Sequence, residues 1–170
     1  MKNKELQEKR MKGYFIQATK EILKGEGIQS LSVRNISERA GYSYTTLYNY
    51  FKDLNDLIFY CVSDFQEECR QFVAEKTQPT KPGSEKLKQS ILSYIEYFLE
   101  YPGIFELFYL AKVSDFGNKQ ETIKLIENSL NKVCEGDWQY CIDNSIILPQ
   151  KQEMAQKQVQ YVAIGLLLLY

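Results

Sequence analysis

The sequence predicts an all-α protein, in which a small three-helix domain at the N-terminus precedes a larger helical domain. Apolar residues recur three and four positions apart along almost the whole chain, which is the spacing of an amphipathic helix. Short segments rich in glycine and proline separate these runs. No segment shows the sustained alternation of apolar and polar residues that is typical of a strand. We predict two domains, residues 1–53 and residues 54–170.

The first predicted helix covers residues 4–24. Its apolar positions fall on one stripe, as expected for a helix with one buried face. The stripe consists of Phe15, Ala18, Thr19, Ile22 and Leu23. Gly25 and Gly27 follow within three residues, and we expect them to end this helix.

Residues 32–51 (SVRNISERAGYSYTTLYNYF) predict two short helices joined by a tight turn. Ser32 and Ser43 are suitable N-cap residues, and Gly41 can adopt the left-handed conformation that ends a helix. Helices this short are not stable alone, so we expect them to pack against the first helix. The arrangement is that of a helix-turn-helix, whose second helix enters the major groove of DNA. An ordinary helical hairpin remains the alternative on this pattern alone.

The second short helix is predicted to bury some residues and to expose polar ones. We assign Tyr42, Leu47 and Tyr50 to the core. The remaining positions carry hydroxyl and amide groups, which suit contacts with phosphates and base edges. These exposed positions are Tyr44, Thr45, Thr46, Tyr48 and Asn49.

This helix offers a limited direct readout of base sequence. No Arg or Lys lies between Ser43 and Phe51, so bidentate recognition of guanine from this helix is excluded. A Thr methyl group can contact a thymine methyl group, and Asn49 can pair with adenine if it reaches the base. We therefore expect modest direct readout, with a share of the specificity from DNA shape.

The charges are distributed unevenly, although the formal net charge is only −1. Residues 1–52 contain ten basic and five acidic residues, whereas the remainder contains eleven basic and seventeen acidic residues. A basic N-terminal segment favours an electrostatic footprint for phosphate. Solvation of a frayed N-terminus is an equal alternative for its first five basic side chains, Lys2, Lys4, Lys9, Arg10 and Lys12.

The composition argues against an enzyme or a metal protein. There is no histidine, which excludes His-dependent acid–base and triad catalysis. The four cysteines form no CxxC pair, so a zinc site of the usual type is not expected, and burial as small apolar groups is their default role. There is no glycine-rich phosphate loop, and we predict no catalytic residue, no metal and no cofactor.

The rest of the chain predicts further helices. The predicted elements are a helix from 54 to about 76, a loop at 77–84, a helix capped by Ser84 and broken at 101–103, a short apolar helix at 104–110, an amphipathic stretch over 120–147 with a kink or interruption at Gly136, and a final helix from about 150 to 170.

Aromatic residues are concentrated in residues 84–116, and this concentration has two interpretations. For any single ring, a place in the helical core is the default. The rings are more numerous than a small bundle needs, however, so they also predict a cavity for a small apolar or aromatic ligand. The candidate ligand-binding residues are Tyr94, Tyr97, Phe98, Tyr101, Phe105, Phe108, Tyr109 and Trp138, with Phe116 in the same concentration and Phe65 and Cys69 as weaker candidates.

Three motifs give the first 55–60 residues a resemblance to a known family. They are LSVRNI at 31–36, AGYS at 40–43 and TLYNYF at 46–51. In this order they resemble the N-terminal domain of the TetR family of bacterial transcriptional regulators. The resemblance implies a cytoplasmic, dimeric DNA-binding protein that is released from DNA by a small molecule bound in the second domain.

The resemblance also implies roles for individual residues. Ser32 and Arg34 would contact phosphates, and Tyr48 would donate its hydroxyl group to a phosphate. Tyr44, Thr45 and Thr46 would face base edges or adjacent phosphates. The sequence departs from the family pattern at Thr45, where Gly or Pro is frequent, and at Leu54, where a phosphate-binding Lys is common. Lys52 is the candidate replacement for that Lys.

The final two helices are the predicted dimer interface. Family members dimerise through such a pair. Independently, an exposed apolar helix end needs cover, and a palindrome needs two-fold symmetry.

The apolar run at 162–170 is about half as long as a membrane-spanning helix, so no membrane partner is expected. We predict a ligand-responsive regulator, with repression as the expected mode. The alternative is an all-helical small-molecule sensor or carrier without DNA binding.

Overall fold

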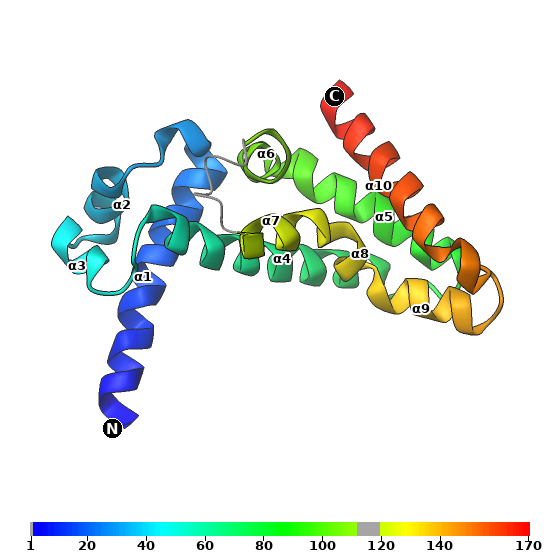
Figure 1. Ribbon diagram of the computed structural model, residues 1–170, viewed down its shortest axis with the longest axis horizontal. Helices are drawn as coiled ribbons and strands as arrows, with labels where there is room; N and C mark the ends of the chain where they lie inside the picture. Colours follow the sequence, from blue (N-terminus) through cyan, green and yellow to red (C-terminus); the bar gives the residue numbers. More distant parts are fainter. Residues whose placement is uncertain (1, 112–119) are drawn as a thin grey trace. The chain divides into compact units, whose positions relative to one another are not determined.

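The computed structural model describes residues 2–111 and 120–170, and all regular structure in these ranges is helical (Figure 1). The all-α prediction is therefore confirmed for the described residues. The chain divides into two compact units. The first unit combines the N-terminal segment up to Phe65 with residues 102–125, and the second combines residues 66–101 with residues 126–170.

The first unit begins with α1 (Lys2–Glu26), which is the long helix predicted from the apolar stripe. A short 3₁₀ turn (Ile28–Ser30) leads to α2 (Val33–Ala40) and α3 (Tyr44–Tyr48). The first half of α4 (Leu54–Thr77) completes the head, a name we use for residues 2–65. Its core consists of side chains that are at most 3% exposed, namely Phe15, Ala18, Ile22, Leu23, Ile36, Leu47, Phe51 and Leu57.

One predicted core residue of the head lies at its surface. Tyr42 is 38% exposed, so its assignment to the core was wrong. Its ring stacks on Tyr14 of α1, with centroids 5.8 Å apart and planes at 30°. A tyrosine at a turn can pack one side of its ring and leave the other side in water. Leu47 is fully buried as predicted, and Tyr50 is half-buried.

A later segment of the chain packs against the end of α1 within the first unit. It consists of α6 (Pro102–Phe105) and a π-helical turn (Glu106–Leu110). A Cβ built on Gly103 would lie 1.9 Å from the carbonyl oxygen of Leu23, so only glycine fits there. The Glu106 carboxylate accepts a hydrogen bond of 3.2 Å from the backbone N–H of Ile28. Gly103 and Glu106 therefore fix α6 to the segment that leads into α2.

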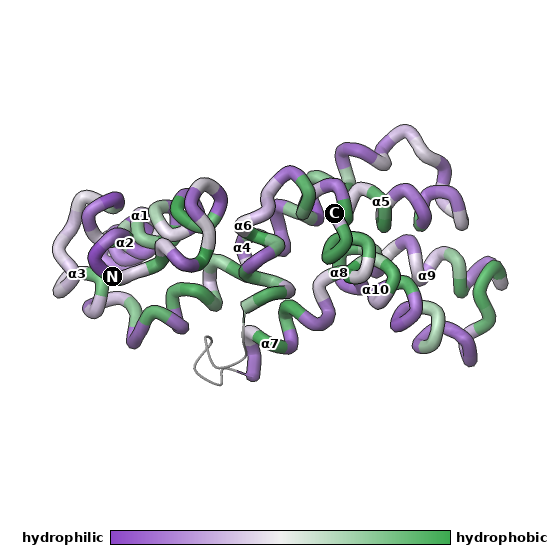
Figure 2. The backbone as a smooth tube through the Cα atoms, turned by 90° about the horizontal axis from the view of Figure 1, so that it is seen from above, coloured by the Kyte–Doolittle hydropathy of each residue, from purple (hydrophilic) through white to green (hydrophobic). Residues whose placement is uncertain are grey.

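The second unit contains the remainder of α4 together with α5 (Ser84–Glu100), α8 (Ser129–Val133), α9 (Glu135–Asp143) and α10 (Gln152–Leu169). The Ser90 hydroxyl and the Asp137 carboxylate lie 2.6 Å apart and link α5 to α9. The Gln160 side chain donates to the backbone carbonyl of Glu127, 2.8 Å away, and links α10 to the end of α7 (Gln120–Glu127). Figure 2 shows the helices of this unit beside one another, each with hydrophobic and hydrophilic stretches.

Two predicted helix boundaries differ from the structure. Ser84 is the first residue of α5, and the N-cap is Gly83, whose φ of 144° is open to glycine alone. The interruption predicted at Gly136 lies elsewhere, because Asn128 and Cys134 separate the helices while Gly136 lies inside α9. In both places the helix boundary lies at a nearby residue, and not at the residue whose type predicted it.

All four cysteines are buried and unbridged, as the default interpretation predicted. Burial raises the pKa of the Cys134 thiol to about 12, with a further contribution from the nearby Asp137 carboxylate. Burial likewise raises the pKa of Cys61, Cys69 and Cys141.

Among residues 2–111 and 120–170, no helix combines the length and the apolar character that a bilayer requires.

The contact at Gly103 predicts a stability effect. Gly103→Ala is expected to lower the free energy of unfolding by about 1–3 kcal/mol, because the added methyl group would displace backbone atoms of α1. Urea denaturation followed by circular dichroism measures the difference. The matched control is Gly136→Ala, whose methyl group meets open space and which should be stabilising by up to about 1 kcal/mol. Equal stability of Gly103→Ala and the native chain would contradict the close packing.

Candidate nucleic-acid interface

The turn between α2 and α3 has the geometry that the sequence predicted. Gly41 lies in the left-handed region, with φ 75° and ψ 25°. The backbone N–H of Gly41 donates to Glu38 (3.2 Å), and that of Tyr42 donates to Ser37 (3.0 Å). These two bonds satisfy carbonyl groups at the end of α2, as in a helix that ends on a left-handed glycine. The chain therefore reverses abruptly and α3 begins three residues later.

Both predicted serine caps are present. Ser32 Oγ accepts a hydrogen bond from the backbone N–H of Asn35 at 3.1 Å, and Ser43 Oγ accepts one from Thr46 at 3.2 Å. The Ser43 and Thr46 hydroxyl oxygens are also 2.9 Å apart. A side-chain cap of this kind stabilises a helix by about 1 kcal/mol, a large contribution for a helix of only five residues.

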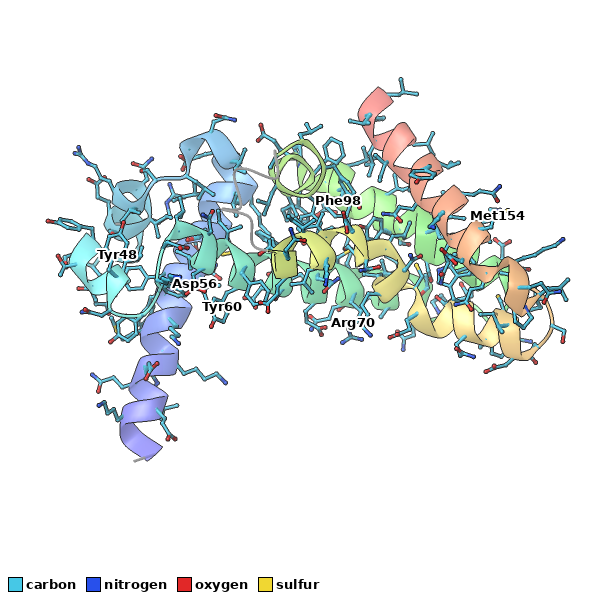
Figure 3. All side chains as sticks on the ribbon, viewed as in Figure 1. Tyr48, Asp56, Tyr60, Arg70, Phe98 and Met154 are labelled. Carbon is cyan, nitrogen blue, oxygen red and sulfur yellow. The ribbon has the colours of Figure 1, made fainter. Side chains whose placement is uncertain are left out.

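The outer face of α3 carries the side chains that the sequence placed there. Tyr44 is 64% exposed and Tyr48 is 52% exposed, and Thr45 and Asn49 are also exposed. Thr46 is half-buried because its hydroxyl group packs back on Ser43. Tyr48 projects from the outer edge of the head in Figure 3. Asn49 follows the last helical residue as the C-cap, so α3 is shorter than predicted.

An open groove of about 710 Å³ lies between α2 and α3. Four residues of α2, two of the turn and two of α3 line it, namely Val33, Arg34, Ser37, Glu38, Tyr42, Ser43, Tyr44 and Tyr48. The Ser37 hydroxyl group is buried and has no hydrogen-bond partner within the described residues. The groove therefore presents aromatic faces beside hydroxyl groups, a surface able to contact sugar and phosphate.

The two arginines of α2 are held by carboxylates. The Arg34 guanidinium donates to Glu38 at 2.8 Å, and this bond raises the pKa of Arg34. Arg39 is bonded to Glu26 of α1. The Arg34 pair is exposed, so it contributes little stability and a phosphate can replace the carboxylate at small cost. Lys52 lies between α3 and α4 and is exposed, while its backbone N–H donates to Asp56 at 3.2 Å.

The predicted ligand-binding residues fall into two groups. Tyr94, Tyr97, Phe98, Tyr101 and Trp138 belong to the second unit, and Phe105, Phe108 and Tyr109 belong to the first unit. The first group contains a chain of ring contacts, with centroids 4.9 Å apart for Tyr94 and Phe98, 5.5 Å for Tyr97 and Phe98, and 5.2 Å for Tyr97 and Tyr101.

Several of these rings are buried. Tyr94, Tyr97, Phe98, Phe108 and Trp138 are at most 5% exposed, so they serve the helical cores of their units whatever else they do. In the first unit, the rings of Phe105 and Tyr109 are 5.6 Å apart. Phe65 and Cys69 are also buried, and Phe116 lies outside the described residues.

Comparison with known proteins identifies the head. Residues 15–61 match the family model described as bacterial regulatory proteins of the tetR family. The head is a TetR-family DNA-binding domain. The head therefore contains a helix-turn-helix of the kind found in these regulatory proteins, as the three motifs implied.

Two solved structures are similar to this chain in fold. One is a putative TetR-family transcriptional regulator from Vibrio parahaemolyticus, with 14% identity, a TM-score of 0.51, and coverage of 92% of this chain and 84% of that one. The other is a TetR-family transcription regulator from Marinobacter aquaeolei VT8, with 18% identity, a TM-score of 0.50, and coverage of 98% and 96%. At such low identity the similarity concerns the fold.

Sequence reasoning missed one residue of this TetR-family head. Tyr14 lies off the apolar stripe of α1, is half-exposed, and stacks on Tyr42 beside the cap of α3. An aromatic residue on the polar side of an amphipathic helix is the available signal, because such a ring needs a partner.

Proposed function

We propose that the protein is a ligand-responsive repressor that binds a palindromic operator as a dimer and is released by a small apolar or aromatic effector. The observation that carries the DNA-binding half is the outer face of α3. This face presents two tyrosines, a threonine and an asparagine on a helix that is held rigidly by Leu47 and the Ser43 cap. Uncharged hydrogen-bonding groups on a short, fixed helix suit contact with a DNA groove.

The proposed contacts divide into positioning and reading. Ser32, Arg34, Ser43, Tyr48 and Lys52 bind phosphates, which fixes the register of the head on the duplex. Four side chains face base edges or adjacent phosphates, and these are Tyr44, Thr45, Thr46 and Asn49. Because α3 contains no cation, the readout is weak at guanine and a share of the specificity comes from DNA shape.

Two substitutions on the head separate positioning from reading. Tyr48→Phe removes a proposed phosphate contact and is expected to weaken binding to all duplexes equally, by about 0.5–1.5 kcal/mol. Asn49→Ala is expected to weaken binding to the operator by about 1–3 kcal/mol and to spare a scrambled duplex. Fluorescence anisotropy on DNA from upstream of the protein's own gene, with a scrambled duplex beside it, measures both.

The control for these variants is Tyr140→Phe, which removes an exposed phenolic hydroxyl group in the second unit. This variant should bind like the native chain. If the native chain binds no duplex even at low salt, DNA binding is wrong, and the helical sensor or carrier becomes the better interpretation. If Tyr48→Phe and Asn49→Ala both bind normally, the assignment of α3 as the reading helix is wrong.

The dimer proposal rests on the exposed apolar surface of α10. Its large exposed side chains are Met154, Tyr161, Val162, Leu166, Leu168 and Leu169, with Leu169 88% exposed. A groove of about 310 Å³ runs between α10 and α5 of the second unit. Its lining is mostly apolar, with Ile91, Leu92, Val162 and Leu166 beside the side chains of Lys88 and Gln158. A continuous apolar surface of this kind marks an interaction site. A second copy supplies the two-fold symmetry that reading a palindrome needs.

A charge on α10 tests the dimer. Leu166→Glu is expected to convert the dimer to a monomer, because burial of an unpaired carboxylate at an interface is costly. Sedimentation velocity measures the change, and operator affinity should fall with it because one head contacts only one half-site. Leu110→Glu, which adds the same charge at an exposed leucine of the first unit, is the control. An unchanged dimer in Leu166→Glu would contradict the role of α10.

The effector proposal rests on two polar groups of the second unit, the unit that also holds the ring cluster, which we define as Tyr94, Tyr97, Phe98 and Tyr101. The Tyr97 hydroxyl group lies 3.5 Å from the Glu68 carboxylate, and burial together with this carboxylate raises the pKa of Tyr97. Trp138 is 3% exposed, and its indole N–H has no hydrogen-bond partner within the described residues. A flat ligand with one hydrogen-bond acceptor would satisfy that donor.

The proposed signal travels along the chain into the head. Tyr101 of the ring cluster directly precedes Pro102, the first residue of α6. Gly103 and Glu106 then hold α6 against α1 and the turn before α2. A ligand that binds better to one position of Tyr101 can therefore bias the position of α6. Ligand control requires such a difference in affinity between two states of the protein.

Trp138 is the only tryptophan of the sequence, so its emission reports on a single place. Titration with a panel of flat aromatic amides and phenols is expected to change this emission saturably for at least one compound. The same compound should release the operator over the same concentration range, because both effects follow one binding event. Changes that are linear in concentration for every compound, with no release of DNA, would contradict the effector site.

A further inference from the structure

The first turns of α1 form a projecting segment that precedes the family domain. The helix begins at Lys2, whereas the match to the family model begins at Phe15. Residues 4–10 are all exposed, and Figure 1 shows this end of α1 extending beyond α2 and α3. A helix of this length without tertiary contacts is only marginally stable in water.

Arg10 in this segment is unusual among the arginines. The chain has four, and three of them are bonded to carboxylates, namely Arg34 to Glu38, Arg39 to Glu26 and Arg70 to Glu67. Within the described residues, Arg10 forms no ion pair. The reason is visible in the sequence, because the positions three and four residues away are occupied by Leu6, Gln7, Gly13 and Tyr14, and none of these is acidic.

The face of α1 that carries Arg10 is fixed relative to α3. Tyr14 lies one helical turn after Arg10 and therefore shares its face. The Tyr14 ring stacks on Tyr42, the residue directly before the Ser43 cap of α3. Gly13, beside them, leaves open space where a side chain would stand. Arg10 therefore lies on the face of α1 that contacts the residue before the α3 cap, one helical turn away from that contact.

We propose that Arg10 binds a backbone phosphate of the same duplex that α3 reads, just outside the proposed half-site. This inference rests on the proposed DNA binding and extends its surface to α1. A guanidinium group without a carboxylate partner loses no ion pair when it meets a phosphate, and it can donate two parallel hydrogen bonds to the phosphate oxygens. Phosphates are common to every sequence, so the contact adds affinity and not base discrimination.

The salt dependence of binding tests this contact. Arg10→Gln keeps helix propensity and length but removes the charge. The slope of log K against log salt is expected to become shallower by about 0.9 per lost contact, which is about 1.8 for a dimer. The change should be the same on the upstream duplex and on a scrambled duplex. Arg10→Lys should retain most of the native slope, because it retains the charge.

The matched control is Lys81→Gln, which removes one exposed positive charge in the second unit and should leave the slope unchanged. If Arg10→Gln has the slope of the native chain while the native chain binds DNA, the Arg10 contact is wrong and the proposed function stands. If Arg10→Gln lowers affinity for the upstream duplex alone, Arg10 reads bases and the phosphate role is wrong. If the native chain binds no duplex, both proposals fail together.

Discussion

The structure of the head depends on the burial of one leucine in a helix too short to be stable by itself. Leu47 is fully enclosed, Thr46 is half-buried, and the other residues of α3 face outward. A five-residue helix forms few internal hydrogen bonds, so its position is determined by Leu47, by the Ser43 cap and by the left-handed Gly41 before it. The core between α1 and α4 therefore fixes the position of α3 and leaves its small outer face exposed.

Local patterns carried most of the information on the head. The α1 stripe, the Ser32 and Ser43 caps and the Gly41 turn each involve residues within four positions of one another, so they could be read from the sequence. The contact of Gly103 with Leu23 and the bond from Ile28 to Glu106 join residues about eighty positions apart. No local pattern encodes such a contact, and Gly103 in the sequence resembles an ordinary helix breaker beside a proline.

The candidate sites differ in how far the sequence could predict them. The exposure of Tyr44, Thr45, Tyr48 and Asn49 follows from helical spacing once Leu47 is placed inside. The ring cluster is different, because a ring that fills a core and a ring that lines a ligand cavity follow the same spacing. Tyr42 shows the related difficulty that an amphipathic ring can satisfy an apolar position while standing half in water.

The charges of the head suggest how affinity and selectivity are divided. The face of α3 is uncharged, so it can discriminate between sequences but gains little from the field of the duplex. The arginines of α2 are each bonded to a carboxylate and must exchange that partner before they bind phosphate. A surface built in this way binds weakly unless further cations flank it. In the proposed complex, Arg10 has no acidic neighbour on its face of α1 and meets that requirement without an exchange of partners. It adds a salt-dependent contact at the edge of the proposed footprint, besides those proposed for Arg34 and Lys52.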